Sequence, residues 1–224
     1  MNRGILCNFV GWFIFWIIRG ILKIYTIIFF CGSWFIPGKY ENLTDKTQIV
    51  IARHISRNDI PLVLAALPRT NRILYVARKG LRMLGWLENN SFFRRCAEGK
   101  HIVFVDRNET TKEQAELITS AIKSGWLRFI VIFPEGATLP QDQCLNPGFV
   151  ILARRYKLQI RPVRIIPWGC YRRKKERKSL GILGMGARHT SVKVGNPFFY
   201  EDISREEKDY DAIAKRAMEI VDRV

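Results

Sequence analysis

The chain has 224 residues, enough for one sizeable hydrophobic core, so a single globular domain is the simplest expectation. Its 37 Lys and Arg against 20 Asp and Glu give a formal charge of +17, which favours anionic partners such as nucleic acid, an anionic membrane surface, or acidic small molecules and proteins. Five cysteines and three histidines are scattered without Cys-x-x-Cys or metal-ligand spacing, which argues against a disulfide framework and a metal site.

The amino-terminal segment from Gly4 to Pro37 is almost entirely apolar and aromatic. Arg19 and Lys23 interrupt it, and a spanning helix centred there would bury each charge in hydrocarbon at about 2.5–3.5 kcal/mol. The apolar pieces on either side are each shorter than the roughly 20 residues that a crossing helix needs. We therefore expect residues 1–40 to form a helical membrane anchor, monotopic rather than spanning. A cleaved signal peptide is disfavoured because no small-x-small site follows.

After this segment, apolar stretches of strand length alternate with stretches of helix length. We expect strands at residues 48–53, 73–77, 101–105, 129–133, 159–166 and 191–194, and helices at 60–67, 81–87, 112–124, 149–156 and 204–223. This alternation predicts an α/β domain over residues 41–224, in which a largely parallel mixed sheet is flanked by helices.

The first expected strand is followed directly by His54, and Asp59 lies five residues further on. A neutral imidazole can take a proton near pH 7, and a carboxylate can fix its tautomer and stabilise the imidazolium that forms. The alternative is structural: Asp59 or Asn58 caps the helix that begins around Pro61, and His54 is a polar loop residue. Position alone leaves both interpretations open.

The strand expected at 129–133 runs into Pro134, Glu135 and Gly136. Glu135 therefore stands at the carboxyl end of a strand, which is the edge where ligands bind in open α/β sheets. Gly136 would let a ligand or another loop approach the backbone closely. The structural alternative is an ordinary strand-ending turn.

The strand expected at 101–105 runs into Asp106 and Arg107. A guanidinium in that position can bind a phosphate through two parallel hydrogen bonds. The structural alternative is a surface ion pair between Arg107 and Asp106 or Glu109. A separate basic run at 171–178 is either a solvated loop or a contact with anionic headgroups.

Taken in order, these three strand ends resemble the glycerolipid acyltransferases of the 1-acylglycerol-3-phosphate acyltransferase type. That family carries a His-x4-Asp block, a later block ending in arginine, and a Phe-Pro-Glu-Gly block. These are matched here by residues 54–59, by Arg107 and by residues 133–136, and a fourth, proline-containing apolar block is matched by residues 160–163. The resemblance covers residues 48–166, and the order and spacing of the blocks carry it.

The resemblance implies acyl transfer from a thioester to the free hydroxyl of a lysophospholipid, with 1-acylglycerol-3-phosphate giving phosphatidic acid as the first expectation. It implies His54 as general base with Asp59 as its partner, and Arg107, Glu135 and Gly136 in the acceptor site. Lys79 is a weaker second candidate for the phosphate, its alternative being an exposed lysine at a helix start. No cofactor is implied, and the co-substrate is acyl-CoA or an acyl-acyl carrier protein. The scattered cysteines and the apolar amino terminus lead us to expect a location at the cytoplasmic face of the cell membrane.

Two positions depart from the family pattern. Arg53 precedes His54 where the family often has asparagine, and Ala137 follows Gly136 where it often continues Gly-Thr-Arg-Ser. The missing arginine removes one expected phosphate ligand, which leaves the acceptor headgroup open and makes a lyso-aminolipid or another lysolipid the alternative.

Two other protein classes fit parts of the sequence. A basic nucleic-acid-binding protein would explain the charge but not the apolar amino terminus or the carboxylates at strand ends, so we expect no nucleic-acid partner. A catalytically silent membrane scaffold would be indicated by loss of the His/Asp pair, and the pair is intact here.

Overall fold

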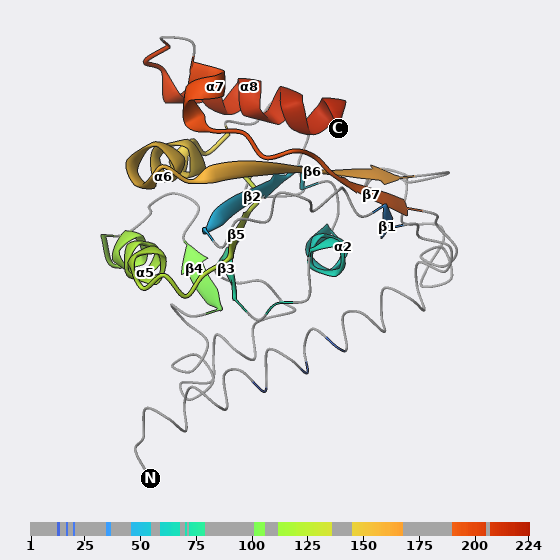
Figure 1. The fold of residues 1–224 in the computed structure, drawn as a ribbon, viewed down its shortest axis with the longest axis horizontal. Coiled ribbons are helices and arrows are strands. Elements are labelled where there is room, and N and C mark those ends of the chain that lie inside the picture. Colours follow the sequence, from blue (N-terminus) through green and yellow to red (C-terminus); the bar gives the residue numbers. More distant parts are fainter. Residues whose placement is uncertain are drawn as a thin grey trace.

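The structure is a computed structural model, and it describes residues 13, 17, 20, 35–36, 46–54, 59–67, 70, 72–78, 101–105, 112–135, 145–167, 190–204 and 207–224. Within these residues a 7-stranded sheet has the order β1-β7-β6-β2-β5-β3-β4. Helices cover both faces of this sheet (Figure 1).

The elements follow the chain in alternation. The strands are β1 (Phe35–Ile36), β2 (Gln48–Ala52), β3 (Ile73–Arg78), β4 (Ile102–Val105), β5 (Phe129–Ile132), β6 (Gln159–Pro167) and β7 (Thr190–Val194). The helices are α2 (Asp59–Ala66), α5 (Lys112–Lys123), α6 (Gly148–Tyr156), α7 (Tyr200–Ser204) and α8 (Tyr210–Arg223).

The sheet is parallel except for the pairing of β6 with β7, which is antiparallel. The carboxyl ends of β6, β2, β5, β3 and β4 therefore lie at one edge of the sheet. All five residues of the central strand β2 are buried, as expected for a parallel strand covered on both faces. The predicted α/β fold with a largely parallel mixed sheet is confirmed.

The two faces of the sheet pack into separate apolar cores. Val50 and Ala52 of β2 face the core covered by α2, while Ile49 and Ile51 face the core covered by α5, α6 and α8. Successive side chains of a strand point to opposite faces, so each strand contributes to both cores. This alternation decides on which face each side chain beyond the end of β2 lies.

Each of the six predicted strands is present within one residue of its expected bounds, and so are the predicted helices at 60–67, 112–124 and 149–156. The predicted helix at 204–223 is wrong as a single element, because residues 207–209 separate α7 from α8. Asp209 has an extended backbone, and its side chain accepts a hydrogen bond from the backbone N–H of Asp211 at 2.9 Å. This capping contact starts a new helix instead of continuing the previous one. The helix expected at 81–87 lies outside the described residues.

Of the predicted anchor, the structure describes Phe13, Ile17 and Gly20, which are helical, and the strand β1. β1 pairs in parallel with β7, so the sheet includes two residues of the segment assigned to the anchor. Among the described residues no helix combines the length and the apolar character needed to cross a membrane. The rest of the anchor and the basic run at 171–178 lie outside the described part of the chain.

Candidate active site

The site is built where β2 and β5 end side by side. The two strands are parallel neighbours, with Ile51 opposite Ile132. The chain then continues to His54 beyond β2 and to Glu135 beyond β5. Two segments that are 81 residues apart in sequence therefore leave the sheet together, and the side chains that follow each strand can meet.

His54 and Asp59 are in direct contact. Nδ1 of His54 lies 3.1 Å from Oδ2 of Asp59, which is the first residue of α2. The side chain of Asp59 is fully buried, whereas that of His54 is 14% exposed. Because a carboxylate accepts hydrogen bonds and does not donate them, we assign the hydrogen of this contact to Nδ1, which leaves Nε2 with a lone pair that can accept a proton.

An aromatic side chain lies beside the His54 ring. The ring of Phe133, which directly follows β5, lies 4.9 Å from the His54 ring between centroids, at an interplanar angle of 36°. Phe133 also packs against the core on the α2 face. The imidazole thus contacts a carboxylate at one nitrogen and an aromatic ring along its side.

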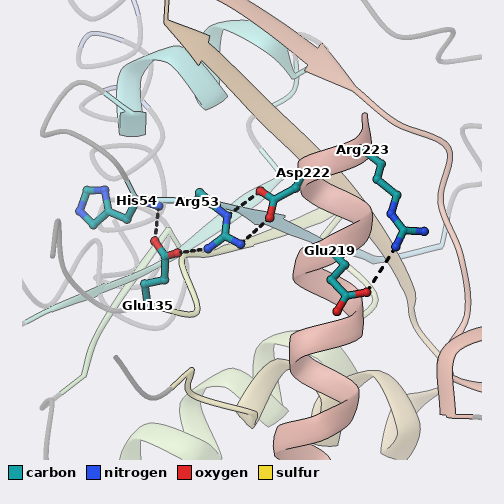
Figure 2. A network of polar contacts seen from close by, with 6 residues as sticks. All are labelled: Arg53, His54, Glu135, Glu219, Asp222 and Arg223. Carbon is teal, nitrogen blue, oxygen red and sulfur yellow. Dashed lines mark hydrogen bonds and ion pairs between the residues drawn. The ribbon is translucent and has the colours of Figure 1, made fainter. Parts of the chain in front are cut away.

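Glu135 holds the backbone of His54 (Figure 2). The backbone N–H of His54 donates to Oε2 of Glu135 at 2.8 Å, and Nη1 of Arg53 donates to Oε1 at 2.7 Å. Both carboxylate oxygens therefore accept a hydrogen bond from the end of β2. Glu135 joins the ends of the two strands, and contact with an acceptor substrate remains a prediction for it.

Arg53 extends this network to the carboxyl-terminal helix (Figure 2). Its Nε donates to Oδ1 of Asp222 at 2.6 Å, and its Nη2 donates to Oδ2 of the same carboxylate. The hydrogen bond with Asp222 raises the pKa of the Arg53 guanidinium above its ordinary value, partial burial opposes that rise, and Glu135 adds to it. Arg53 is therefore a fixed cation between two carboxylates.

Replacing Glu135 by glutamine should destabilise the protein by about 1–2 kcal/mol, because one of the two donors then faces an amide NH₂. The measurement is the free energy of unfolding in urea. Glu219→Gln is the matched control, since Glu219 is 61% exposed and pairs loosely with Arg223 on α8 at 3.5 Å. Equal stability of the two variants would contradict the bracing role of Glu135.

Three of the six site residues predicted from sequence are described, and the structure brings all three together: His54, Asp59 and Glu135. Arg107, Gly136 and Lys79 lie outside the described residues. The strands that precede Arg107 and Lys79 are β4 and β3, and both end at the same edge of the sheet as β2 and β5.

Two members of the polar network were missed by the sequence analysis. From the sequence, Arg53 is only the last residue of an expected strand and a departure from a family pattern, and Asp222 is only a residue of the helix expected at 204–223. The two residues are 169 positions apart, and no local pattern connects them. The adjacency of Arg53 to His54 was the one available indication, and it does not identify a partner.

Comparisons with known proteins identify the family and support the fold. Residues 38–166 match the family described as Acyltransferase, which is more than half of the chain. A search of curated protein sequences gave no match. Among solved structures, the fold is similar to the crystal structure of the 1-acyl-sn-glycerophosphate (LPA) acyltransferase PlsC from Thermotoga maritima, at 22% identity, a TM-score of 0.61, and coverage of 100% of this chain and 81% of that chain. The chain belongs to the Acyltransferase family and is an acyltransferase.

Proposed function

We propose that this acyltransferase moves a fatty acyl chain from a thioester donor to the free hydroxyl of a lysophospholipid. The first acceptor is 1-acylglycerol-3-phosphate, and its product is phosphatidic acid. The observation that carries the proposal is the contact between His54 and the fully buried Asp59 at the edge of the sheet where ligands bind. The fold similarity to PlsC supports the same substrate class.

In the proposed reaction, Nε2 of His54 takes the proton of the acceptor hydroxyl as its oxygen attacks the thioester carbonyl carbon. The tetrahedral intermediate then collapses, the carbon–sulfur bond breaks, and the leaving thiolate takes the proton from the imidazolium. Asp59 stabilises that imidazolium while it exists. The products are an ester and a free thiol, and His54 returns to its neutral form. Such general-base catalysis contributes about 10²–10⁴-fold in rate.

Substrate binding is assigned to residues that follow the neighbouring strands. Arg107, with Lys79 as a second cation, would bind the acceptor phosphate, and Gly136 would allow close approach of substrate to the backbone. These roles are supported by the strands β4, β3 and β5, which end at the same edge as β2. Acyl-CoA or an acidic acyl carrier protein is the donor, and the charge of +17 favours either anionic partner.

The test is a panel of acceptors and donors. Purified protein is incubated with lysophosphatidic acid, lysophosphatidylcholine, lysophosphatidylethanolamine and a lyso-aminolipid, each with acyl-CoA and with acyl-acyl carrier protein, and products are identified by mass. We expect phosphatidic acid as the main product. Acylation of a different lysolipid would assign another acceptor, and the absence of any acylated lysolipid would overturn the proposal.

We also expect the amino-terminal segment to hold the enzyme at the cytoplasmic face of a membrane, where lysolipids reside. Deleting residues 1–33, which leaves β1 in place, should lower binding to anionic vesicles by more than about tenfold, because the apolar anchor is removed. Vesicle co-sedimentation measures the bound fraction. The His54→Ala protein, whose segment is intact, serves as the control and should bind like the unaltered protein. Unchanged binding after the deletion would contradict the anchoring role.

A further inference from the structure

We propose that Arg53 and Asp222 are positioning residues, which couple the last turn of α8 to the backbone of His54 and thereby set the rate of acyl transfer. The role in catalysis rests on the proposed function of His54. The structural coupling itself rests on a continuous series of contacts, from Asp222 to Arg53, from Arg53 to Glu135, and from Glu135 to the His54 N–H (Figure 2).

The contacts of Arg53 fix the orientation of its guanidinium. Nε and Nη2 are used for the two oxygens of Asp222, and Nη1 is used for Glu135. The planar guanidinium therefore cannot rotate without losing one of two carboxylates. A lysine ammonium is a point charge without this fork, so it could not hold both carboxylates in the same orientation.

The side chains of Arg53 and His54 lie on opposite faces of the sheet. The side chain of His54 lies on the α2 face with Asp59 and Phe133, whereas that of Arg53 lies on the α8 face with Asp222. Adjacent residues of an extended chain point to opposite faces, which explains this division. Arg53 therefore reaches His54 through Glu135 and the backbone, rather than through the imidazole.

We expect the contacts of Arg53 and Asp222 to position the His54 backbone more than they hold α8 in place. The side chain of Arg53 is 27% exposed and that of Asp222 is 46% exposed, and ion pairs with this exposure add little to folding stability. The attachment of α8 comes from its buried apolar residues, which are Ile213, Ala214, Ala217, Met218 and Val221. A substitution of Asp222 should therefore loosen the His54 backbone while α8 stays docked.

The first test compares Asp222→Asn with Glu219→Gln, which removes the same charge one turn earlier on α8 from a loose, exposed pair. We expect Asp222→Asn to lower kcat by about tenfold with KM for both substrates nearly unchanged, because the base is displaced, whereas the proposed phosphate ligands Arg107 and Lys79 follow other strands, β4 and β3. The backbone amide of His54 should also exchange its hydrogen about tenfold faster, because its acceptor Glu135 is less firmly held. Glu219→Gln should change neither quantity.

The second test uses Arg53 itself. Arg53→Met should lower kcat by about 10²-fold, and Arg53→Lys should restore little of that loss, because the ammonium lacks the fork. Adding Asp222→Asn to Arg53→Met should lower kcat by less than about twofold further, since both changes break one connection. Unfolding midpoints of all variants are measured alongside.

Several outcomes would overturn the inference. Equal kcat and equal His54 amide exchange in Asp222→Asn and Glu219→Gln would show that α8 and His54 are not coupled. The inference would also fail if the losses of kcat caused by Arg53→Met and Asp222→Asn multiplied in the double variant. It would fail as well if the loss of kcat were matched by a loss of folded protein. If the unaltered protein acylates no lysolipid, the proposed function fails, and the amide exchange of His54 still decides whether the coupling exists.

Discussion

Replacing His54 by alanine is expected to lower acyl transfer by about 10³-fold, because the acceptor hydroxyl loses the imidazole that takes its proton. The contact between Nδ1 and the buried Asp59 leaves Nε2 as the nitrogen proposed to take the proton, so no other atom of this pair can substitute for it. The measurement is the initial rate of product formation, detected by mass, at saturating concentrations of both substrates.

Two controls accompany the His54 variant. His54→Gln keeps an amide that can donate to Asp59 but supplies no base, so it should be as inactive as His54→Ala while preserving the buried contact. Both variants should bind anionic vesicles like the unaltered protein. Full activity in either variant would rule out His54 as the general base.

Asp59→Asn is expected to lower kcat by about 10²–10³-fold. The amide has nearly the same shape as the carboxylate, but its NH₂ can donate to Nδ1 and so stabilise the tautomer that carries the proton on Nε2. That tautomer cannot act as a base at the reactive nitrogen. The amide also cannot stabilise the imidazolium by its charge. Steady-state kinetics with both substrates varied separate this loss from any change in KM.

The matched control for Asp59→Asn is Asp211→Asn. Asp211 is also an acidic residue in the first turn of a helix, α8, and it is exposed to solvent. Both substitutions remove a negative charge that interacts favourably with a helix amino terminus, but only Asp59 contacts a histidine. Equal activity of the two variants would mean that Asp59 serves α2 alone and has no part in the reaction.

The pairing of His54 with Asp59 was predictable because it is local. A strand followed by a histidine, and a helix that begins with an aspartate, bring together two side chains that are only five positions apart in sequence. The structure also shows that the two interpretations of Asp59 are compatible. Asp59 is the first residue of α2, and its carboxylate reaches back to His54.

Glu135 was predicted at the correct edge, but its contacts were not. The rule that ligands bind at the carboxyl ends of strands placed it near the site. That its two oxygens would accept from the His54 backbone and from Arg53 depends on β5 lying next to β2. Strand order is a property of the folded sheet, so no pattern within either strand could indicate it.

Most of the secondary structure of this protein, and one contact of its candidate site, can be predicted from local sequence. Side-chain periodicity reflects which face of each segment is buried, so the strands β2 to β7 and the helices α2, α5 and α6 are predictable from it. The His54–Asp59 contact is predictable from the short separation of the two residues, whereas β1 is not predicted. The strand order, the break between α7 and α8, and the link from Asp222 through Arg53 to Glu135 become visible in the folded protein alone. These features depend on contacts between segments that meet only when the whole chain packs, and Arg53 and Asp222, 169 positions apart, are the clearest example.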